Sequence, residues 1–195
     1  MNNDIYNEKA GLRRLCREKR NSIDKTDKEN YDSLICEYIR ALPEFCKSSI
    51  LLAYFPVGSE INVTSLVDTA YKMGKRVAFP VCIDGSKMIF RYCRSLDDLT
   101  DGTYSIPAPK EECDVCIPTE EAFCIVPALA VDKFGYRMGY GRGYYDRFLS
   151  SYTGACAVVI YEELIFDRIP HNENDIKIAK VITQKGERQL EDEIR

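Results

Sequence analysis

Apolar residues in the first part of the chain recur at the spacing of an amphipathic helix. Between Asp24 and Leu42 they appear every three or four positions, which places them on one helical face. The members of this face are Tyr31, Leu34, Ile35, Tyr38, Ile39 and Leu42. Pro43 is expected to end the helix. A shorter basic helix is predicted before it, with an apolar side formed by Ile5, Leu12, Leu15 and Cys16.

Short apolar runs between polar segments predict buried strands. The predicted strands are Ser49 to Phe55, Arg76 to Cys82, Met88 to Cys93, Ala122 to Val131, Ala155 to Tyr161 and an edge strand from Ile176 to Thr183. The second and third are expected to form a hairpin through Asp84-Gly85. Pro127 lies inside the most apolar run, where it predicts a bulge or the end of the strand.

Two further helices lie between these runs. The first carries Val63, Leu66, Val67, Ala70 and Tyr71 on one stripe and is expected to stop at Gly74, and the second starts at Tyr144 and runs to Ser151. Asp97 to Cys116, rich in Gly, Pro, Asp and Thr, is predicted to be a long surface loop. Strands alternating with helices predict an α/β fold, a mostly parallel sheet with helices on both faces in three α/β/α layers. We expect one domain over residues 1–195, with a frayed tail at residues 184–195.

Composition and charge narrow the classes of function. Apolar residues make up 45% and charged residues 30% of the chain, as in ordinary globular proteins. A net charge of −4 argues against a general nucleic-acid binder. Basic residues nevertheless concentrate between Lys9 and Arg20, where Glu18 is the only acid. This local patch favours a small anionic ligand. The polar start of the chain and the lack of an 18-residue apolar run predict a cytoplasmic protein without membrane contact.

The nine cysteines do not predict a disulfide framework. Their number is odd and no export signal precedes them, so reduced thiols are expected. Cys113 and Cys116 form a C-x-x-C pair, but a zinc site would need a second pair of ligands, and the single histidine, His171, is far away in sequence. We interpret the pair as incidental thiols without a predicted role.

The segment from Asp132 to Asp146 is the most informative part of the sequence. It leaves the most apolar run, and its glycines, Gly139, Gly141 and Gly143, alternate with Tyr140 and Arg142 before a predicted helix. Alternating glycines let backbone N–H groups approach a ligand closely, and with Arg137 and Arg142 they suit phosphate oxygens. The spacing matches neither a Walker loop nor a dinucleotide fingerprint. A mobile glycine-rich turn is the simpler alternative. Asp146 is either a magnesium ligand or an ordinary acid at a helix start.

These motifs resemble the 5-formyltetrahydrofolate cyclo-ligase family, also called methenyltetrahydrofolate synthetases. Pro127 to Asp132 followed by Gly135 to Leu149 is similar to the family signature. The resemblance continues in family order over nearly the whole chain, through Lys9-Ala-Gly-Leu-Arg13, Tyr54-Phe-Pro-Val-Gly-Ser-Glu60-Ile, Ile106-Pro-Ala-Pro109 and Pro170-His-Asn-Glu-Asn-Asp175. Arg142 stands where relatives can have glycine or lysine, and the Cys113–Cys116 pair is not part of the pattern.

The resemblance implies ATP- and magnesium-dependent cyclisation of 5-formyltetrahydrofolate to 5,10-methenyltetrahydrofolate, with release of ADP and phosphate. It implies ATP contacts from Lys9, Arg13, Arg137, Met138, Gly139, Tyr140, Gly141, Arg142, Gly143, Tyr144 and Tyr145. Folate contacts are implied for Phe55, Glu60, Tyr140, Gly141, Arg142, Gly143 and Tyr144. Magnesium is implied at Asp146 and Asp175, and catalytic roles are expected for Arg142, Tyr144 and Asp146.

Other interpretations remain open at this point. Lys9 and Arg13 lie four residues apart and share a helical face, which alone is typical of a solvated surface. Phe55 alone is a strand-end core residue, and Glu60 a helix-start acid. A paralogue with another substrate, a non-catalytic nucleotide- or folate-binding protein, and an RNA-binding module are the alternative functions. The expected partner is the small-molecule folate, with no nucleic acid and no membrane, and the chain is expected to be a monomer.

Overall fold

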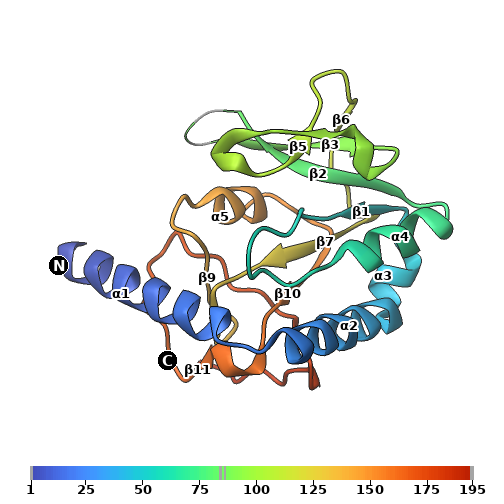
Figure 1. The fold of residues 1–195 in the computed structure, drawn as a ribbon. Helices are drawn as coiled ribbons and strands as arrows, with labels where there is room; N and C mark the ends of the chain where they lie inside the picture. The colour runs from blue at the N-terminus through green and yellow to red at the C-terminus, as the bar shows by residue number, and fades with distance from the viewer. Residues whose placement is uncertain (1, 84, 86, 194–195) are drawn as a thin grey trace.

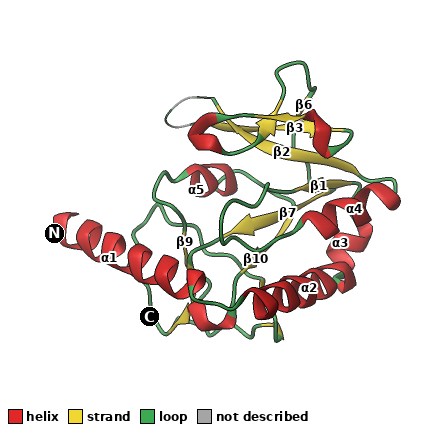
Figure 2. Ribbon diagram, in the orientation of Figure 1, coloured by secondary structure: helices red, strands yellow, loops and turns green. Residues whose placement is uncertain are grey.

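A single eight-stranded sheet forms the centre of the computed structural model, which describes residues 2–83, 85 and 87–193 (Figure 1, Figure 2). In spatial order its strands are β13 (Gly186–Glu187), β12 (Val181–Thr183), β10 (Ala155–Val159), β7 (Ala122–Pro127), β1 (Ile50–Leu52), β2 (Arg76–Cys82), β3 (Met88–Cys93) and β6 (Val115–Cys116). The five central strands run parallel, whereas β13, β3 and β6 at the two edges pair antiparallel. The predicted mostly parallel sheet is therefore confirmed.

The parallel strands are buried because their side chains are apolar on both faces. In the register, Leu51 of β1 lies between Val77 of β2 and Phe123 of β7, and all three side chains are inaccessible to solvent. A strand covered on both faces has no polar side to present to water, which explains the continuous apolar runs. The predicted hairpin of β2 and β3 is also present, with Phe79 opposite Arg91. Asp84 in its turn lies outside the described residues.

Helices cover both faces of this sheet, as predicted. The α-helices are α1 (Asn2–Asn21), α2 (Lys25–Ala41), α3 (Pro43–Lys47), α4 (Thr64–Lys72) and α5 (Tyr144–Leu149). The crossover β1–α4–β2 and the crossover from β7 through α5 to β10 run in opposite directions along the sheet. Right-handed crossovers in opposite directions place α4 and α5 on opposite faces. Helix α2 packs on α4, and α5 packs on β3 through Phe148 and Phe90, whose ring centroids are 5.0 Å apart.

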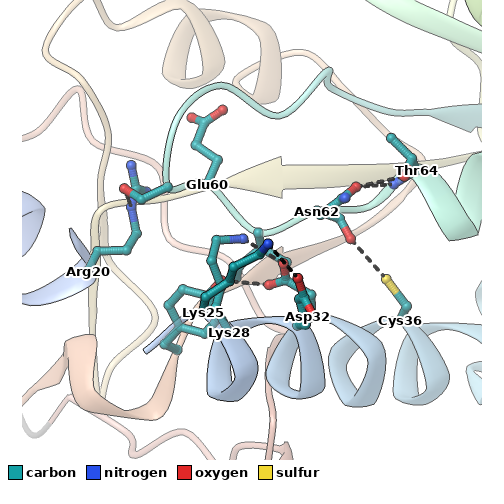
Figure 3. A network of polar contacts seen from close by, with 12 residues as sticks. Arg20, Lys25, Lys28, Asp32, Cys36, Glu60, Asn62 and Thr64 are labelled. Carbon is teal, nitrogen blue, oxygen red and sulfur yellow. Dashed lines mark hydrogen bonds and ion pairs between the residues drawn. The ribbon is translucent and has the colours of Figure 1, made fainter. Parts of the chain in front are cut away.

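A buried polar network joins α2 to the segment that follows β10. Tyr161 donates a hydrogen bond to Oδ1 of Asp32 over 2.6 Å, and Lys28 Nζ lies 2.6 Å from Oδ2 of the same carboxylate (Figure 3). Asp32 and Tyr161 are both buried, so an unpaired carboxylate here would be costly. The network therefore fixes how α2 sits against the sheet.

Several predicted elements are divided or shortened in the structure. The apolar run from Ala122 to Val131 is not one strand, because β7 ends at Pro127, which has no N–H group to continue the ladder. After that proline, β8 (Ala130–Asp132) joins a separate sheet with β9 (Arg137–Met138) and β11 (Ile165–Phe166). The expected edge strand from Ile176 covers only Val181–Thr183, and β13 pairs along its outer side. The basic helix α1 is also longer than predicted, at 20 residues against 17 for α2.

The two segments predicted to be irregular contain more structure than expected. The segment Asp97 to Cys116 holds a small hairpin of β4 (Leu99–Thr100) and β5 (Ala108–Pro109), and then β6. The predicted tail makes several contacts with the rest of the protein. It contains β13, the Glu191 N–H donates to the Lys133 carbonyl over 2.8 Å, and Leu190 packs against the core. None of the helices in the described part of the chain combines the length and the apolarity needed to cross a bilayer.

Candidate active site

A cleft with a volume of about 720 Å³ lies at the carboxyl ends of β1, β2 and β7. This is where ligands bind in sheets of parallel strands, because the chain leaves the sheet there in loops. Helix α1 lies beyond the end to which the β7 arrow points in Figure 1. The cleft is lined by every residue predicted from the sequence to contact ATP, folate or magnesium, namely Lys9, Arg13, Phe55, Glu60, Arg137, Met138, Gly139, Tyr140, Gly141, Arg142, Gly143, Tyr144, Tyr145, Asp146 and Asp175.

The glycine-rich loop connects β9 to α5 along one wall of the cleft. Gly141 has a φ of +98° and Gly143, which caps α5, a φ of +67°. Both values lie in the left-handed region of backbone conformation, which residues with a Cβ rarely adopt. A Cβ on Gly141 would also lie 3.1 Å from Cζ of Arg13. Arg13 itself holds the loop, because its Nε donates to the Gly139 carbonyl over 3.0 Å. The glycines therefore let the backbone pass close beneath α1.

Cationic side chains from two distant segments meet at this loop. Lys9 and Arg13 project from one face of α1, and Arg137 enters from β9 with only 3% of its side chain exposed. Burial lowers the pKa of Arg13, and the neighbouring Arg17 acts in the same direction. Within the described part of the chain, Nε of Arg137 is buried without a hydrogen-bond partner. A guanidinium donor in that state favours an incoming anion such as a phosphate.

Two carboxylates complete this end of the cleft. Oδ1 of Asp146 accepts hydrogen bonds from Arg137 Nη2 over 2.9 Å and from the Ile176 N–H over 3.1 Å. Oδ2 of Asp175 accepts from Lys9 Nζ over 2.5 Å and from the Asn172 N–H over 2.7 Å. The Ile176 contact therefore brings the residue after Asp175 against Asp146.

These two carboxylates are residues that could hold a magnesium ion. Among the described residues, the hydrogen bonds to Asp146 end on Oδ1 and those to Asp175 on Oδ2, so the second oxygen of each is available. Magnesium at a phosphate site is commonly held by one or two carboxylates, with water and phosphate oxygens as the other ligands. The sequence could not show this proximity, because 29 positions separate the two acids.

An acid and aromatic side chains form another part of the cleft wall. Phe55 and Glu60 follow β1, and Oε2 of Glu60 accepts a hydrogen bond from the Val57 N–H over 2.8 Å. Tyr140 of the glycine-rich loop faces the same region. Partial burial and the neighbouring carboxylate of Glu60 raise the pKa of Tyr140 to about 12, against an opposing effect of Arg20. Tyr140 is thus a neutral hydroxyl at physiological pH.

Arg20 connects this acidic wall to the glycine-rich loop and was not predicted as a site residue. Its Nη2 donates to the Tyr140 hydroxyl over 2.8 Å and its Nε to Oγ of Ser59 over 3.0 Å. Figure 3 shows its side chain near Glu60, and both residues line one small cavity. Arg20 lies seven residues after Arg13, on the same face of α1, so helical spacing was a signal that could have identified it.

The remaining wall of the cleft also lay outside the predicted site. It comprises Pro80, Val81, Cys82 and Met88 of the β2–β3 hairpin, and residues 100–103 and 106–111 around β4 and β5. The motif Ile106 to Pro109 marked this segment in the sequence, but without a role.

Tyr145, one of the predicted ATP contacts, faces the cleft too. Within the described residues its buried hydroxyl has no partner, and desolvation raises its pKa.

Comparisons with known proteins point to one family. Residues 5–184 match the model of the 5-formyltetrahydrofolate cyclo-ligase family. The chain is 30% identical over 168 residues to a probable 5-formyltetrahydrofolate cyclo-ligase from Schizosaccharomyces pombe, covering 76% of this chain and 81% of the relative. It is 28% identical over 186 residues to the 5-formyltetrahydrofolate cyclo-ligase of Mycolicibacterium smegmatis, covering 91% and 94%. The NMR structure of Aquifex aeolicus 5,10-methenyltetrahydrofolate synthetase superposes with a TM-score of 0.80 at 29% identity, covering 96% and 95%.

Proposed function

Because the chain belongs to the 5-formyltetrahydrofolate cyclo-ligase family, we propose that this cleft converts 5-formyltetrahydrofolate to 5,10-methenyltetrahydrofolate while ATP is cleaved to ADP and phosphate. One observation carries the proposal. A cationic glycine-rich loop suited to phosphate and an acidic, aromatic wall suited to a pterin line the same cleft. A protein that bound only a nucleotide would have no need for the second wall.

The reaction requires a formamide oxygen to become a leaving group. Transfer of the γ-phosphoryl group to the formyl oxygen forms a P–O bond and breaks the bond to ADP. N10 of the folate then attacks the formyl carbon and releases its proton to water, and phosphate departs with the former formyl oxygen. Neither step needs a covalent bond to the protein. Positioning and charge neutralisation therefore supply most of the catalysis.

We assign the phosphate-binding work to the glycine-rich loop and to the cations around it. Lys9, Arg13 and Arg137 neutralise the triphosphate, and the backbone from Arg137 to Tyr145 lies along it. We expect three groups to contact the transferring phosphoryl group. They are Arg142, just before α5, Tyr144, at its start, and Asp146, in its first turn. The partnerless Nε of Arg137 supports this assignment, because a bound phosphate would satisfy it.

Asp146 and Asp175 are the residues that would hold magnesium, which supplies positive charge to the phosphate oxygens when it is bound. Arg137 and Lys9 orient these two carboxylates through the contacts of 2.9 and 2.5 Å. Each carboxylate therefore neutralises a lysine or arginine, and its second oxygen is the one we assign to the metal. Loss of either acid would disturb the phosphate-binding cations as well as the metal.

The folate is assigned to the wall formed by Phe55, Glu60 and Tyr140. A carboxylate is suited to the amino group and ring N–H donors of a pterin, because its two oxygens accept two parallel hydrogen bonds. Phe55 offers an apolar surface beside it. Arg20 donates hydrogen bonds to Tyr140 of the glycine-rich loop and to Ser59, the neighbour of Glu60. These bonds fix the distance between the loop and the wall to which we assign the pterin. Such a separation matters because the formyl oxygen must meet the γ-phosphate.

Glu60→Gln is expected to weaken folate binding by at least ~10-fold while ATP binding stays within about twofold of the unmodified protein. The amide oxygen can still accept the Val57 N–H, so the local turn is preserved, but the amide nitrogen cannot accept a pterin N–H. Calorimetric titration with each ligand separately measures both affinities. Equal losses for the two ligands would indicate a folding defect, and no loss would move the pterin away from Glu60.

The reaction itself is tested by mixing the purified protein with MgATP and 5-formyltetrahydrofolate. We expect the absorbance of the methenyl product to rise in proportion to ADP formation. Binding of both ligands without turnover would favour a non-catalytic binding protein. ATP binding with no folate binding would favour a paralogue that acts on another substrate.

A further inference from the structure

Two cysteines and an aspartate meet outside the residues that line the cleft. The ligand atoms of Cys93, Asp98 and Cys113 all lie within 4.8 Å of one another. Cys93 is the last residue of β3 and is 4% exposed, Asp98 lies in the 3-10 turn Leu96–Asp98, and Cys113 follows β5. The three residues therefore lie at the two ends of the segment that carries the β4–β5 hairpin.

Backbone contacts hold this arrangement in place. Oδ2 of Asp98 accepts the Arg94 N–H over 2.7 Å, and the Asp98 carbonyl accepts the Lys110 N–H over 3.0 Å. From β3, Nη1 of Arg91 donates to the carbonyls of Glu111 over 2.8 Å and of Cys113 over 2.5 Å. Thus hydrogen bonds tie the returning end of the segment to its starting end. The guanidinium of Arg91 also brings a positive charge close to Cys113.

We propose that Cys93, Asp98 and Cys113 form a zinc-binding site. Zinc favours thiolate sulfur and accepts a carboxylate oxygen, and three protein ligands with water as the fourth make a tetrahedral site. Two thiolates and one carboxylate leave a zinc complex with one net negative charge, which the neighbouring Arg91 offsets. A disulfide would employ the two sulfurs alone, whereas a zinc site also uses the Asp98 carboxylate, whose oxygen lies within 4.8 Å of both sulfurs.

The C-x-x-C spacing is not what creates this site. Cys116 lies in β6, where it pairs in register with Phe90, and it is not among the three clustered ligands. Cys113 instead meets Cys93, twenty positions earlier in the chain, because β3 and the strand that follows the hairpin are neighbours in the sheet. The ligand set is thus a product of the antiparallel edge of the sheet.

Zinc at this site would close the base of a loop that lines the cleft. The segment between Cys93 and Cys113 includes Thr100 to Gly102 and Ile106 to Glu111, which form part of the cleft wall. A metal that joins its two ends lowers the number of conformations open to the segment. We therefore expect zinc to protect this segment from limited proteolysis, whatever substrate the cleft takes.

The experiment begins with reduced, metal-free protein titrated with Co²⁺, followed by displacement with Zn²⁺. One ion per chain, with a thiolate-to-cobalt charge-transfer band, is expected. Cys113→Ser and Cys93→Ser are expected to bind at least ~10-fold more weakly. Cys116→Ala is the matched control, because this buried cysteine is three residues from Cys113 and outside the cluster, and it should bind as the unmodified protein does.

Asp98→Asn separates metal binding from folding. The amide oxygen can still accept the Arg94 N–H, so the melting temperature without metal should be nearly unchanged, whereas zinc affinity should fall by at least ~10-fold. Unchanged affinity in both Cys113→Ser and Asp98→Asn would overturn the proposal, as would the absence of a stoichiometric ion. The purified protein could instead contain a Cys93–Cys113 disulfide and bind no zinc after this bond is reduced. That result would show that the two cysteines form a redox pair, and it would overturn the zinc site.

Discussion

Gly141→Val is expected to abolish ATP-dependent cyclisation and to weaken nucleotide binding by at least ~10-fold, about 1.4 kcal/mol. Gly141 has a φ of +98°, a conformation that costs other residues about 1–3 kcal/mol. A Cβ would in addition lie 3.1 Å from the guanidinium carbon of Arg13. Valine must therefore move the loop, displace Arg13, or do both, and each change would disturb groups to which we assign phosphate binding. The measurements are turnover by absorbance and the rise in melting temperature on addition of MgATP.

Gly74→Val provides the matched control for backbone strain. Gly74 also has a positive φ, +73°, but it ends α4 away from the cleft, and a Cβ there would meet nothing within 4 Å. This variant should lose thermal stability yet keep the full stabilisation by MgATP. If Gly141→Val were also stabilised by MgATP to the unmodified extent and still turned over, the loop would not bind phosphate.

Asp146→Asn is expected to reduce turnover by at least ~100-fold and to raise the magnesium concentration needed for half-maximal rate. The amide retains an oxygen for Arg137 and for the Ile176 N–H but loses the negative charge. The loss of an exposed acid at the start of a helix usually lowers the free energy of unfolding only slightly. Arg137 is only 3% exposed, however, so the loss of its counter-charge should also lower the free energy of unfolding by about 1–3 kcal/mol. Magnesium titrations of the rate and chemical denaturation measure the two effects separately.

The control for this variant is Asp68→Asn, which removes an exposed carboxylate of α4 away from the cleft. It should alter neither the magnesium dependence nor the free energy of unfolding by more than about 0.5 kcal/mol. Normal turnover of Asp146→Asn across the whole magnesium titration would exclude Asp146 from the metal site. A loss of stability without any change in magnesium dependence would reduce its role to holding Arg137.

The fold class and the chemistry of the loop follow from local features of the sequence. The three-four spacing between Asp24 and Leu42 is a property of one helix, and the apolar run of Ala122 to Pro127 is a property of one strand buried on both faces. The alternating glycines at 139, 141 and 143 likewise require a backbone that side chains would obstruct, and two of them do have positive φ. Each of these signals is complete within a short segment, because the physical requirement it meets is local.

Contacts between distant segments needed the tertiary structure. No local pattern shows that Asp146 and the residue after Asp175 touch, that Arg20 reaches Tyr140, or that the tail strand Gly186–Glu187 covers the edge of β12. The cluster of Cys93, Asp98 and Cys113 was equally hidden, because Cys93 lies twenty positions before Cys113 in the chain. The sequence alone therefore determined the kinds of elements and the residue types of the glycine-rich loop. Which side chains share a site was decided by packing, because the free energy of burying apolar faces selects which distant segments meet.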